Sequence, residues 1–555
     1  MPPRGHSLFR LAKGMGMRGI GVGIGFCAAL LSAAPVWAQS ATPPQPKTFA
    51  ETVSQVLARP AYRHSRIGLE VWSLDAGKAV FAVDGDKLFT PGSTTKLFTE
   101  GTTLTLLGPD YRFHTPLYRT GKIEKGVLHG DLVLVASGDP NISNRIQPDG
   151  TFAFVDEDHT YGGADSRLIP GDPIIVLRQF AKAVADAGIK RVTGRVLIDI
   201  SLFAEGTREL GTGEVISPII VNDNAIDITY RPGAKVGDAA SWIVAPGMPY
   251  IHFVNKIVTV DGDKTKVDDV TTDHKDGTQT VTLTGTVGIA SGPVIYGYAL
   301  SGPSRFAGTL LGMALKDAGV KVSGKPGIVT AQATETSVGA DRTRKFYTDA
   351  MRVAEHVSPP LSEDVRITLK MSQNLHASTM PYVLGAVLGK VSEKADHKGF
   401  ALEHDFLAKA GLDMSGASQA DGAGGAVAAF YSPDFVVHYL DYMSRQPTAE
   451  MFRASLPVLG KDGTLVDIQK TSPGAGHVFA KTGTFSDHDL LNSGHTILTG
   501  KGLAGYTTTV DGRRLAFAFY INNAELPDDS SVSQMAGQAL GEMASALYAL
   551  PLGAP

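Results

Sequence analysis

Ser93 and Lys96 stand three residues apart at the start of a segment that is predicted to be helical. Residues 96–107 are apolar at roughly helical spacing, and Gly108 and Pro109 follow as a stop signal. Side chains three apart share one helix face, so the hydroxyl and the amine can meet. An amine kept neutral by burial or by a second cation can take the serine proton and create a nucleophile. Alone, the pair could equally be a helix cap followed by a solvated lysine.

Two later segments carry side chains suited to the same chemistry. Ser372 and Asn374 form the one Ser-x-Asn triplet of the chain, and Lys481-Thr482-Gly483 is its one Lys-Thr-Gly triplet. Each also has an ordinary explanation, because Ser and Asn can cap a turn and Lys can protect an edge strand. The order of the three motifs and their predicted settings (a helix start, a loop between helices, a strand) favour one nucleophilic site.

The elements that must position these groups are predicted from periodicity. A helix over 49–57 precedes an alternating β-hairpin over 67–83, which leads into the serine helix. An apolar helix over 532–550 ends the chain and is predicted to pack on a sheet. The predicted strands of the last hundred residues are 478–482, 503–510 and 514–521, the last two joined by an Asp511-Gly512 turn.

The middle of the chain has a different pattern. Short strands surround one good helix, 173–187, between residues 111 and about 210. Strands dominate from about 217 to 301, which predicts an all-β lobe. Helix then returns, with predicted segments over 306–318, from 361 onward, and over 380–388, 400–410 and 433–443.

Composition and charge limit the possible partners. The chain has 555 residues, of which 43% are apolar and 19% charged, so it is a globular protein of two or three domains. Four of its 51 Lys and Arg lie in the first 38 residues, which hold no Asp or Glu, so the remainder has a net charge of about −8. Such a body offers no basic surface to nucleic acid or to anionic lipid.

The N-terminus is typical of a cleavable Sec-type export signal. Basic residues extend to Arg18, an apolar run covers 20–34, and small residues at Val36-Trp37-Ala38 precede Gln39. An uncleaved anchor is the alternative. The sole cysteine, Cys27, lies inside this segment, so cleavage leaves no thiol for catalysis, a disulfide or a metal. We expect a periplasmic protein with at most peripheral membrane contact.

Together the three motifs resemble those of the serine penicillin-recognising enzymes, whose fold gathers them around one cleft. The chain is similar to the class C low-molecular-mass penicillin-binding proteins, the D-alanyl-D-alanine carboxypeptidase/endopeptidase family. Further segments carry this resemblance over nearly the whole mature chain. They are Gly130-Asp131-Leu132, Gly138-Asp139-Pro140, an expected Asn-rich strand at Asn222-Asp223-Asn224, an Arg231-Pro232-Gly233 turn, Asp421-Gly422, Leu456-Pro457, Asp462-Gly463-Thr464-Leu465 and Leu503-Ala504-Gly505-Tyr506.

The resemblance implies an α/β fold: a serine β-lactamase/transpeptidase-like domain, with an antiparallel sheet flanked by helices and a helical lobe, plus two inserted β-rich domains. The family places its extra domains in the long gap between Lys96 and Ser372. The implied divisions are a signal peptide over 1–38, a catalytic domain over 39–110 and 345–555, an inserted α/β domain II over 111–215 and 302–344, and an inserted β-rich domain III over 216–301.

The resemblance also implies catalytic roles. Ser93 would attack the carbonyl of the penultimate D-Ala of a peptidoglycan stem peptide, with Lys96 as general base. Asn374 would hold Lys96 and the substrate amide. Ser372 would pass a proton to the departing amine, and Lys481 would be the cation that keeps Lys96 neutral.

Substrate binding is implied in the same way. Lys481, Thr482 and Thr484 would bind the terminal carboxylate, and the backbone N–H groups of Ser93 and Thr484 would form the oxyanion hole. No metal or organic cofactor is needed. The expected partners are peptides ending in D-Ala-D-Ala, with β-lactam antibiotics as covalent inhibitors trapped at Ser93.

The chain departs from the family pattern in places. Gln373 replaces the usual Asp or Asn, Ala377-Ser378 replaces Ala-Glu, and Asp421-Gly422-Ala423-Gly424 replaces Asp-Gly-Ser-Gly. About fourteen extra residues within 485–502 predict an enlarged turn at the cleft edge, in which His488 and His495 are solvated.

Two other functions stay open at this point. A β-lactamase is disfavoured by the long insertion and by the lack of a recognisable deacylating glutamate motif near Ser372. A catalytically weak cell-wall-binding scaffold of the same fold is disfavoured by the intact trio of motifs. The lifetime of a penicillin adduct and the release of D-Ala would distinguish these functions.

Overall fold

A computed structural model describes residues 45–330, 347–529 and 531–553. The predicted signal peptide, Cys27 included, lies outside the described residues. The chain from Pro46 onward forms one packed unit. No helix within the described ranges has both the length and the apolar character needed to cross a bilayer.

Strands from the two ends of the chain form the central sheet. Its order is β2-β1-β22-β21-β20, all antiparallel, and β23 pairs with the first residues of β21. The predicted hairpin at 67–83 and the predicted Asp511-Gly512 turn are confirmed. The strands are β1 (Arg66–Ser73), β2 (Lys78–Val83), β20 (Val478–Asp489), β21 (His495–Thr508), β22 (Arg514–Asn522) and β23 (Ala524–Leu526).

The alternation of β22 explains why both faces of this sheet are covered. Phe517, Phe519 and Ile521 belong to one buried cluster, with α1 (Phe49–Leu57) and α11 (Gln538–Ala549). The intervening Ala516, Ala518 and Tyr520 belong to a second cluster on the opposite face, since side chains alternate along a strand. Each large side chain buried in this way contributes about 1.5–3 kcal/mol.

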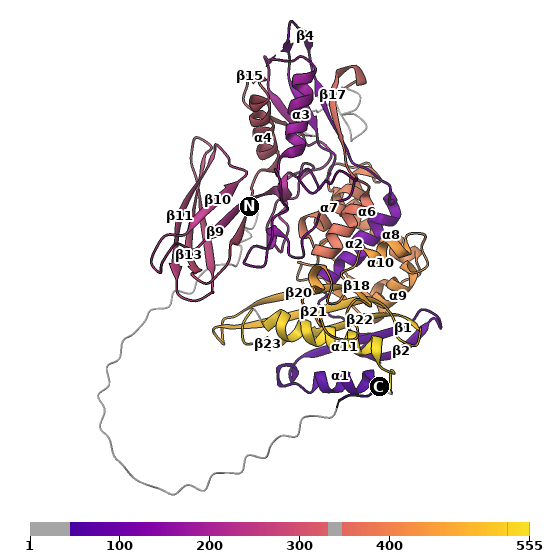
Figure 1. Cartoon of the computed structure of the whole chain (residues 1–555). Helices are drawn as coiled ribbons and strands as arrows, with labels where there is room; N and C mark the ends of the chain where they lie inside the picture. The colour runs from indigo at the N-terminus through magenta and orange to yellow at the C-terminus, as the bar shows by residue number, and fades with distance from the viewer. Residues whose placement is uncertain (1–44, 331–346, 530, 554–555) are drawn as a thin grey trace, which may run out of the picture. The chain divides into compact units, whose positions relative to one another are not determined.

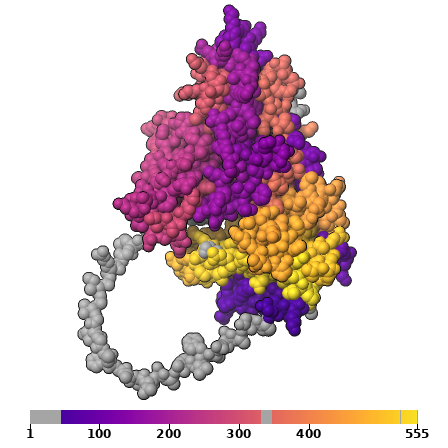
Figure 2. All heavy atoms as spheres, in the orientation of Figure 1, coloured from indigo at the N-terminus to yellow at the C-terminus, as the bar shows by residue number. Residues whose placement is uncertain are grey.

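Figure 1 shows the indigo α1 beside the yellow α11, as the predicted packing of the last helix requires. In the space-filling view the indigo N-terminal and yellow C-terminal residues form one continuous surface (Figure 2). The predicted helix over 532–550 begins with a π-helical segment, Val532–Gly537, and continues as α11, which ends at Ala549.

The serine helix α2 (Lys96–Leu107) lies in the centre of a helical lobe. All nine residues from Lys96 to Leu104 are buried, which is the pattern of a helix surrounded by other elements rather than of a surface helix. Helices α6 and α7 pack on it directly. The lobe contains α6 (Leu361–Met371), α7 (Asn374–Val387), α8 (Ala395–Lys409), α9 (Pro433–Met443) and α10 (Ala449–Ala454).

Between α2 and α6 the described chain forms four further sheets and two long helices, α3 (Ile175–Asp186) and α4 (Pro303–Asp317). Both helices contact the mixed sheet β16-β8-β6-β3-β17. Its strands are β3 (His114–Arg119), β6 (Leu132–Val135), β8 (Val196–Asp199), β16 (Gly327–Val329) and β17 (Arg352–Val357). A smaller sheet contains β4 (Lys122–Glu124), β5 (Val127–His129), β7 (Arg191–Val192) and β15 (Lys321–Val322).

The predicted all-β stretch over 217–301 contains two three-stranded sheets and one short 3-10 turn (Figure 1). The first sheet contains β9 (Ala225–Arg231), β10 (Ser241–Ala245) and β14 (Val294–Ala299), and the second contains β11 (Ile251–Val260), β12 (Lys266–Asp273) and β13 (Gln279–Gly288). The exact domain boundaries stay a prediction.

The expected Asn-rich strand is wrong. Asn222, Asp223 and Asn224 have φ values of 49°, 51° and 53° and form a left-handed turn just before β9. Asn and Asp tolerate this conformation better than other side chains. The Asn222 amide donates to the carbonyl of Ala225, and the Asn224 side-chain oxygen accepts from the N–H of Val221.

The expected enlarged turn within 485–502 is also wrong. β20 and β21 stay paired as far as Asp489↔His495, so the extra residues form a long two-stranded extension with a short turn over 490–494. Thr496, Ile497 and Leu498 suit a strand and pair with β23 on their other edge.

Two glycines set the close approach of α7 and α8. A β-carbon at Gly399 would overlap the carbonyl of Pro381 in α7, and one at Gly385 would overlap the carbonyl of Ala395 in α8. The helices can cross at this distance only because both positions lack a side chain.

Gly399→Ala is therefore expected to lower the free energy of unfolding by about 1–3 kcal/mol, since the added methyl must push the helices apart. Gly312→Ala is the matched control, because its β-carbon would meet nothing within 4 Å in α4. It should raise stability by about 0.5–1 kcal/mol through helix propensity. Urea unfolding of both variants measures the difference, and equal midpoints would contradict the packing argument.

Candidate active site

Ser93 lies in the 3-10 turn Gly92–Thr95, and Lys96 is the first residue of α2. The Nζ atom of Lys96 is 2.8 Å from the Oγ atom of Ser93. Gly92 has φ +52°, and a β-carbon there would overlap the backbone nitrogen of Thr484 on β20. Only glycine lets the serine turn approach this strand so closely.

The fully buried Lys96 connects the serine motif to the Ser-x-Asn motif. Its Nζ atom is 2.6 Å from the side-chain oxygen of Asn374 and 3.4 Å from Ser372 Oγ. A further contact, 3.2 Å, is to the carbonyl of Ala423. The amine is thus fixed by hydrogen bonds from segments more than 270 residues away in the sequence.

Ser372 lies between two lysines. It caps the end of α6 in the left-handed conformation, with φ 63°, and its hydroxyl lies between the amines of Lys96 and Lys481. Lys481 Nζ donates to Ser372 Oγ at 2.8 Å and to its neighbour's carbonyl, Thr482 O, at 3.0 Å. Ser93, Lys96, Asn374, Ser372 and Lys481 therefore form one continuous chain of hydrogen bonds.

The two predicted threonines are present at the cleft, but their hydroxyls contact no other predicted site residue. Thr482 Oγ1 is 2.8 Å from Thr464 Oγ1. Thr484 Oγ1 accepts from the ammonium of Lys501, an unexpected neighbour, at 2.6 Å. The backbone nitrogen of Thr484 lies close to Gly92 of the serine turn.

Burial is the main cause of the altered basicity of Lys96. It lowers the pKa of this amine to about 8, while Glu209, Asp421 and Glu100 oppose the shift. The sequence predicted Lys481 as the cause. Instead, burial and then repulsion from Lys96 and Lys501 hold the pKa of Lys481 well below its usual range. Because both pKa values are lowered, Lys96 and Lys481 together carry fewer protons near neutral pH than two ordinary lysine amines would.

Two residues from the region between α2 and α6 complete the site and were not predicted. The Tyr161 hydroxyl lies 2.5 Å from the carbonyl of Ser372 and 3.3 Å from Asn374 Oδ1. A β-carbon at Gly211 would overlap the side-chain nitrogen of Asn374. Nothing in the local sequence marks either residue, because both reach the site only through the fold.

Asp421 has a supporting role that the motif comparison alone did not reveal. Its carboxylate accepts from the backbone N–H groups of Gly424 and Gly425 at 2.7 and 2.8 Å. These bonds fix the loop that presents the carbonyl of Ala423 to Lys96. The alanine that replaces the family's serine at this position therefore contributes its backbone.

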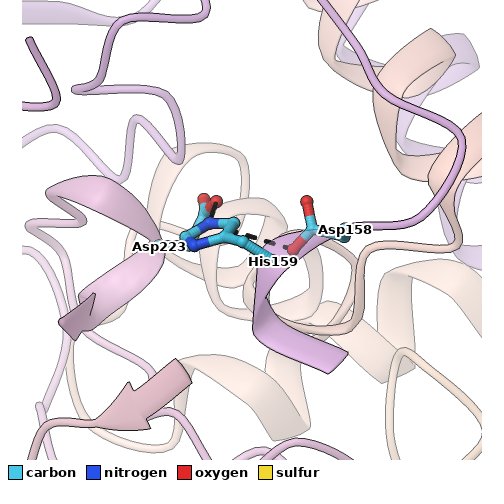
Figure 3. A group of neighbouring side chains, drawn as sticks. All are labelled: Asp158, His159 and Asp223. Carbon is cyan, nitrogen blue, oxygen red and sulfur yellow. Dashed lines mark hydrogen bonds and ion pairs between the residues drawn. The ribbon is translucent and has the colours of Figure 1, made fainter. Parts of the chain in front are cut away.

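A buried ion network lies behind the Ser372–Asn374 turn. Figure 3 shows the His159 ring beside the carboxylates of Asp158 and Asp223, from two separate turns. Arg145 Nη2 is 2.7 Å from an oxygen of each of these two aspartates. The guanidinium and the imidazole already neutralise these carboxylates, so the group does not fit a metal ion.

His376 joins this network to the catalytic turn. It is completely buried in the first turn of α7, with Nδ1 2.8 Å from Asp364 and Nε2 2.9 Å from Asp223. Since both ring nitrogens face carboxylates, both must carry protons. These carboxylates outweigh the cost of burial and raise the pKa of His376 to about 10. The His159 ring, between Asp223 and Asp227, likewise has a raised pKa.

His488 and His495 lie on the exposed extension of β20 and β21. His495 Nδ1 is 2.6 Å from Glu525 Oε1, and both rings are about half exposed. These contacts agree with the predicted solvated histidines.

Comparison with known proteins gives a consistent family. The D-Ala-D-Ala carboxypeptidase 3 (S13) family matches residues 49–545. A D-alanyl-D-alanine carboxypeptidase of Actinomadura sp. (strain R39) is 26% identical over 521 residues, which cover 89% of this chain and 84% of that protein. The D-alanyl-D-alanine carboxypeptidase DacB of Haemophilus influenzae is 21% identical over 507 residues, 88% of this chain and 92% of DacB.

Solved structures agree with the fold. Penicillin-binding protein 4 (dacB) of H. influenzae superposes with a TM-score of 0.65 and 20% identity, covering 89% of this chain and 98% of that chain. A second structure of the same protein, complexed with a β-lactam, gives the same TM-score at 19% identity and covers 90% and 98% of the two chains. The predicted fold class is confirmed.

His376→Gln is expected to lower the free energy of unfolding at pH 7 by about 3–5 kcal/mol, because it removes a buried charge between two carboxylates. The histidine contribution is fully present below the unfolded pKa near 6.5 and is lost as the pH rises through about 10. Between pH 7 and 10 the free energy of unfolding of His376→Gln should therefore fall less steeply than that of the wild type, by up to about 1.4 kcal/mol per pH unit.

Urea unfolding at several pH values measures this slope. His404→Gln is the control, because this histidine is 60% exposed and belongs to no buried network. Identical slopes for the wild type and His376→Gln would contradict a buried imidazolium at this position.

Proposed function

The chain belongs to the D-Ala-D-Ala carboxypeptidase 3 (S13) family and is a serine-type hydrolase, and we propose that Ser93 is its nucleophile. The bond cleaved is the one between the last two residues of peptidoglycan stem peptides ending in D-Ala-D-Ala, with the corresponding cross-link as endopeptidase substrate. The observation that carries the proposal is the 2.8 Å contact between Ser93 Oγ and the buried Lys96 amine.

Acylation begins with proton transfer. Neutral Lys96 takes the proton of Ser93 Oγ, and the oxygen attacks the carbonyl carbon of the penultimate D-Ala. Asn374 holds the amine through its side-chain oxygen at 2.6 Å and leaves its N–H group for the substrate amide. The N–H groups of Ser93 and Thr484 stabilise the oxyanion, an effect of roughly 3–4 kcal/mol per donor.

Ser372 connects the base to the leaving group. Its hydroxyl is within reach of both Lys96 and Lys481, at 3.4 and 2.8 Å. The proton taken from Ser93 can pass from Lys96 through Ser372 to the departing amine, and the carboxylate of the leaving residue then faces the Thr482–Thr484 segment of β20. Water then attacks the acyl carbonyl while Lys96 takes a proton from it, the bond between Ser93 Oγ and the acyl carbon breaks, and Lys96 returns the proton to Ser93 Oγ as the shortened peptide leaves.

The same serine would be acylated by penicillin, whose ring carbonyl occupies the place of the peptide carbonyl. The predicted signal peptide supports action in the periplasm, where the cell wall lies.

Fluorescent penicillin should label the purified mature chain covalently, and Ser93→Ala should abolish the label because the hydroxyl that forms the acyl bond is removed. Release of D-Ala from a peptide ending in D-Ala-D-Ala should disappear in the same variant. A gel and an amino-acid assay measure the two outcomes. Labelling that survives in Ser93→Ala would refute the assignment, and rapid turnover of penicillin would indicate a β-lactamase.

The rate constant of penicillin acylation should rise about tenfold between pH 7 and 9. Lys96 must be neutral to act as base, and burial lowers its pKa to about 8, so about a tenth of it is neutral at pH 7. Labelling reactions quenched at a series of times, at each pH in this range, measure how the acylation rate constant depends on pH. Lys96→Met should abolish acylation at every pH, whereas Lys390→Met, at an exposed position, should keep the wild-type profile. A flat wild-type profile would contradict a lysine base.

A further inference from the structure

Lys501 is a buried lysine at the cleft that the three motifs do not include. It lies on β21 directly opposite Thr484 of β20. Only 8% of its surface is exposed, and its Nζ atom donates to Thr484 Oγ1 at 2.6 Å. Cross-strand partners share one face of a sheet, so the ammonium lies on the face that carries the Thr484 hydroxyl.

This lysine has no carboxylate to neutralise it in the described part of the chain. No acidic oxygen there is recorded within 4 Å of the Nζ atom of Lys501 or of Lys481. The acid that acts on Lys501 is Glu157, whose charge opposes the burial that lowers the lysine pKa to about 8. A buried ammonium without an ion-pair partner is costly, and an anion bound beside it would remove that cost.

The two lysines donate to different acceptors. Lys481 is used within the catalytic chain, because it donates to Ser372 Oγ and to the carbonyl of Thr482. Repulsion from Lys96 and Lys501 further favours its neutral form. Lys481 is therefore a poor source of positive charge for a substrate carboxylate.

Lys501 is better placed for that task. An ammonium has three N–H donors, and Thr484 Oγ1 is the one side-chain acceptor found for it in the described residues. Because the Thr484 oxygen accepts from Lys501, its own hydrogen is free to point elsewhere. Thr484 is exposed, so the lysine both orients and polarises a donor that a substrate can reach.

We propose that Lys501 binds the C-terminal carboxylate of the leaving residue together with Thr484, and that Lys481 acts in proton relay instead. The inference rests on the proposed function. The charge of Lys501 on β21, and not the Lys-Thr-Gly motif alone, makes the enzyme prefer peptides with a free terminal carboxylate over peptides that end in a carboxamide.

The test compares two peptides that differ only at the end, acyl-D-Ala-D-Ala with a free carboxylate and the same peptide as the terminal amide. In Lys501→Met, kcat/KM for the free acid should fall tenfold or more, whereas the value for the amide should stay within about threefold. Lys501→Arg keeps the charge and should retain most of the preference for the acid. Lys501→Gln replaces the Met variant if that protein does not fold.

Two controls separate the possible failures. Lys370→Met removes another buried lysine near the cleft, one that is ion-paired with Asp462, and it should affect both peptides equally. Ser93-dependent penicillin labelling is measured on every variant. If Lys501→Met is still labelled by penicillin but its kcat/KM falls equally for both peptides, the carboxylate role is overturned and the proposed function stays intact. Absence of Ser93-dependent labelling in the wild type would overturn the proposed function itself.

Discussion

The removal of the Lys96 amine from water is the constraint on which the site depends. A buried amine needs acceptors, and Lys96 finds them on the serine turn, the Ser372–Asn374 turn and the loop at Ala423. No single segment could supply all of these contacts. The desolvation that lowers the pKa of the amine thus also requires three distant segments to converge on it.

Backbone geometry lets them converge. Glycine at position 92 allows β20 to lie against the serine turn, and a left-handed Ser372 ends α6 so that α7 begins at once with Asn374. Neither feature adds chemistry. Each removes a steric obstacle that would keep the hydroxyls and amines beyond hydrogen-bond distance.

The buried ion network explains how the long insertion contributes to this geometry. Arg145, His159 and Asp223 all come from the chain between α2 and α6, and they meet His376 of α7 two residues after Asn374. Charges in such a network tolerate little displacement, because an unpaired one is costly inside a protein. The insertion therefore supports the catalytic turn from behind, while Tyr161 and the loop at Gly211 contact it from the cleft.

The sequence by itself determined much of this protein. Periodicity and turn residues located the strands and helices around the site, and three short motifs identified the groups with the right chemistry. Two expectations were wrong. The Asn-rich strand that the family resemblance implied is a left-handed turn, and the enlarged turn expected within 485–502 is a paired extension of β20 and β21, because neither backbone dihedrals nor a strand partner can be predicted from a few neighbouring residues.

Only the tertiary structure decided how the charges are shared. The sequence assigned Lys481 as the cation that activates Lys96. In the structure burial is the main cause of the lowered pKa of Lys96, and repulsion from Lys96 and Lys501 lowers the pKa of Lys481 instead. Tyr161, Gly211, His376 and Lys501 carried no local signal. Desolvation and Coulomb interactions depend on distances between atoms, and those distances exist only after residues hundreds of positions apart have packed together.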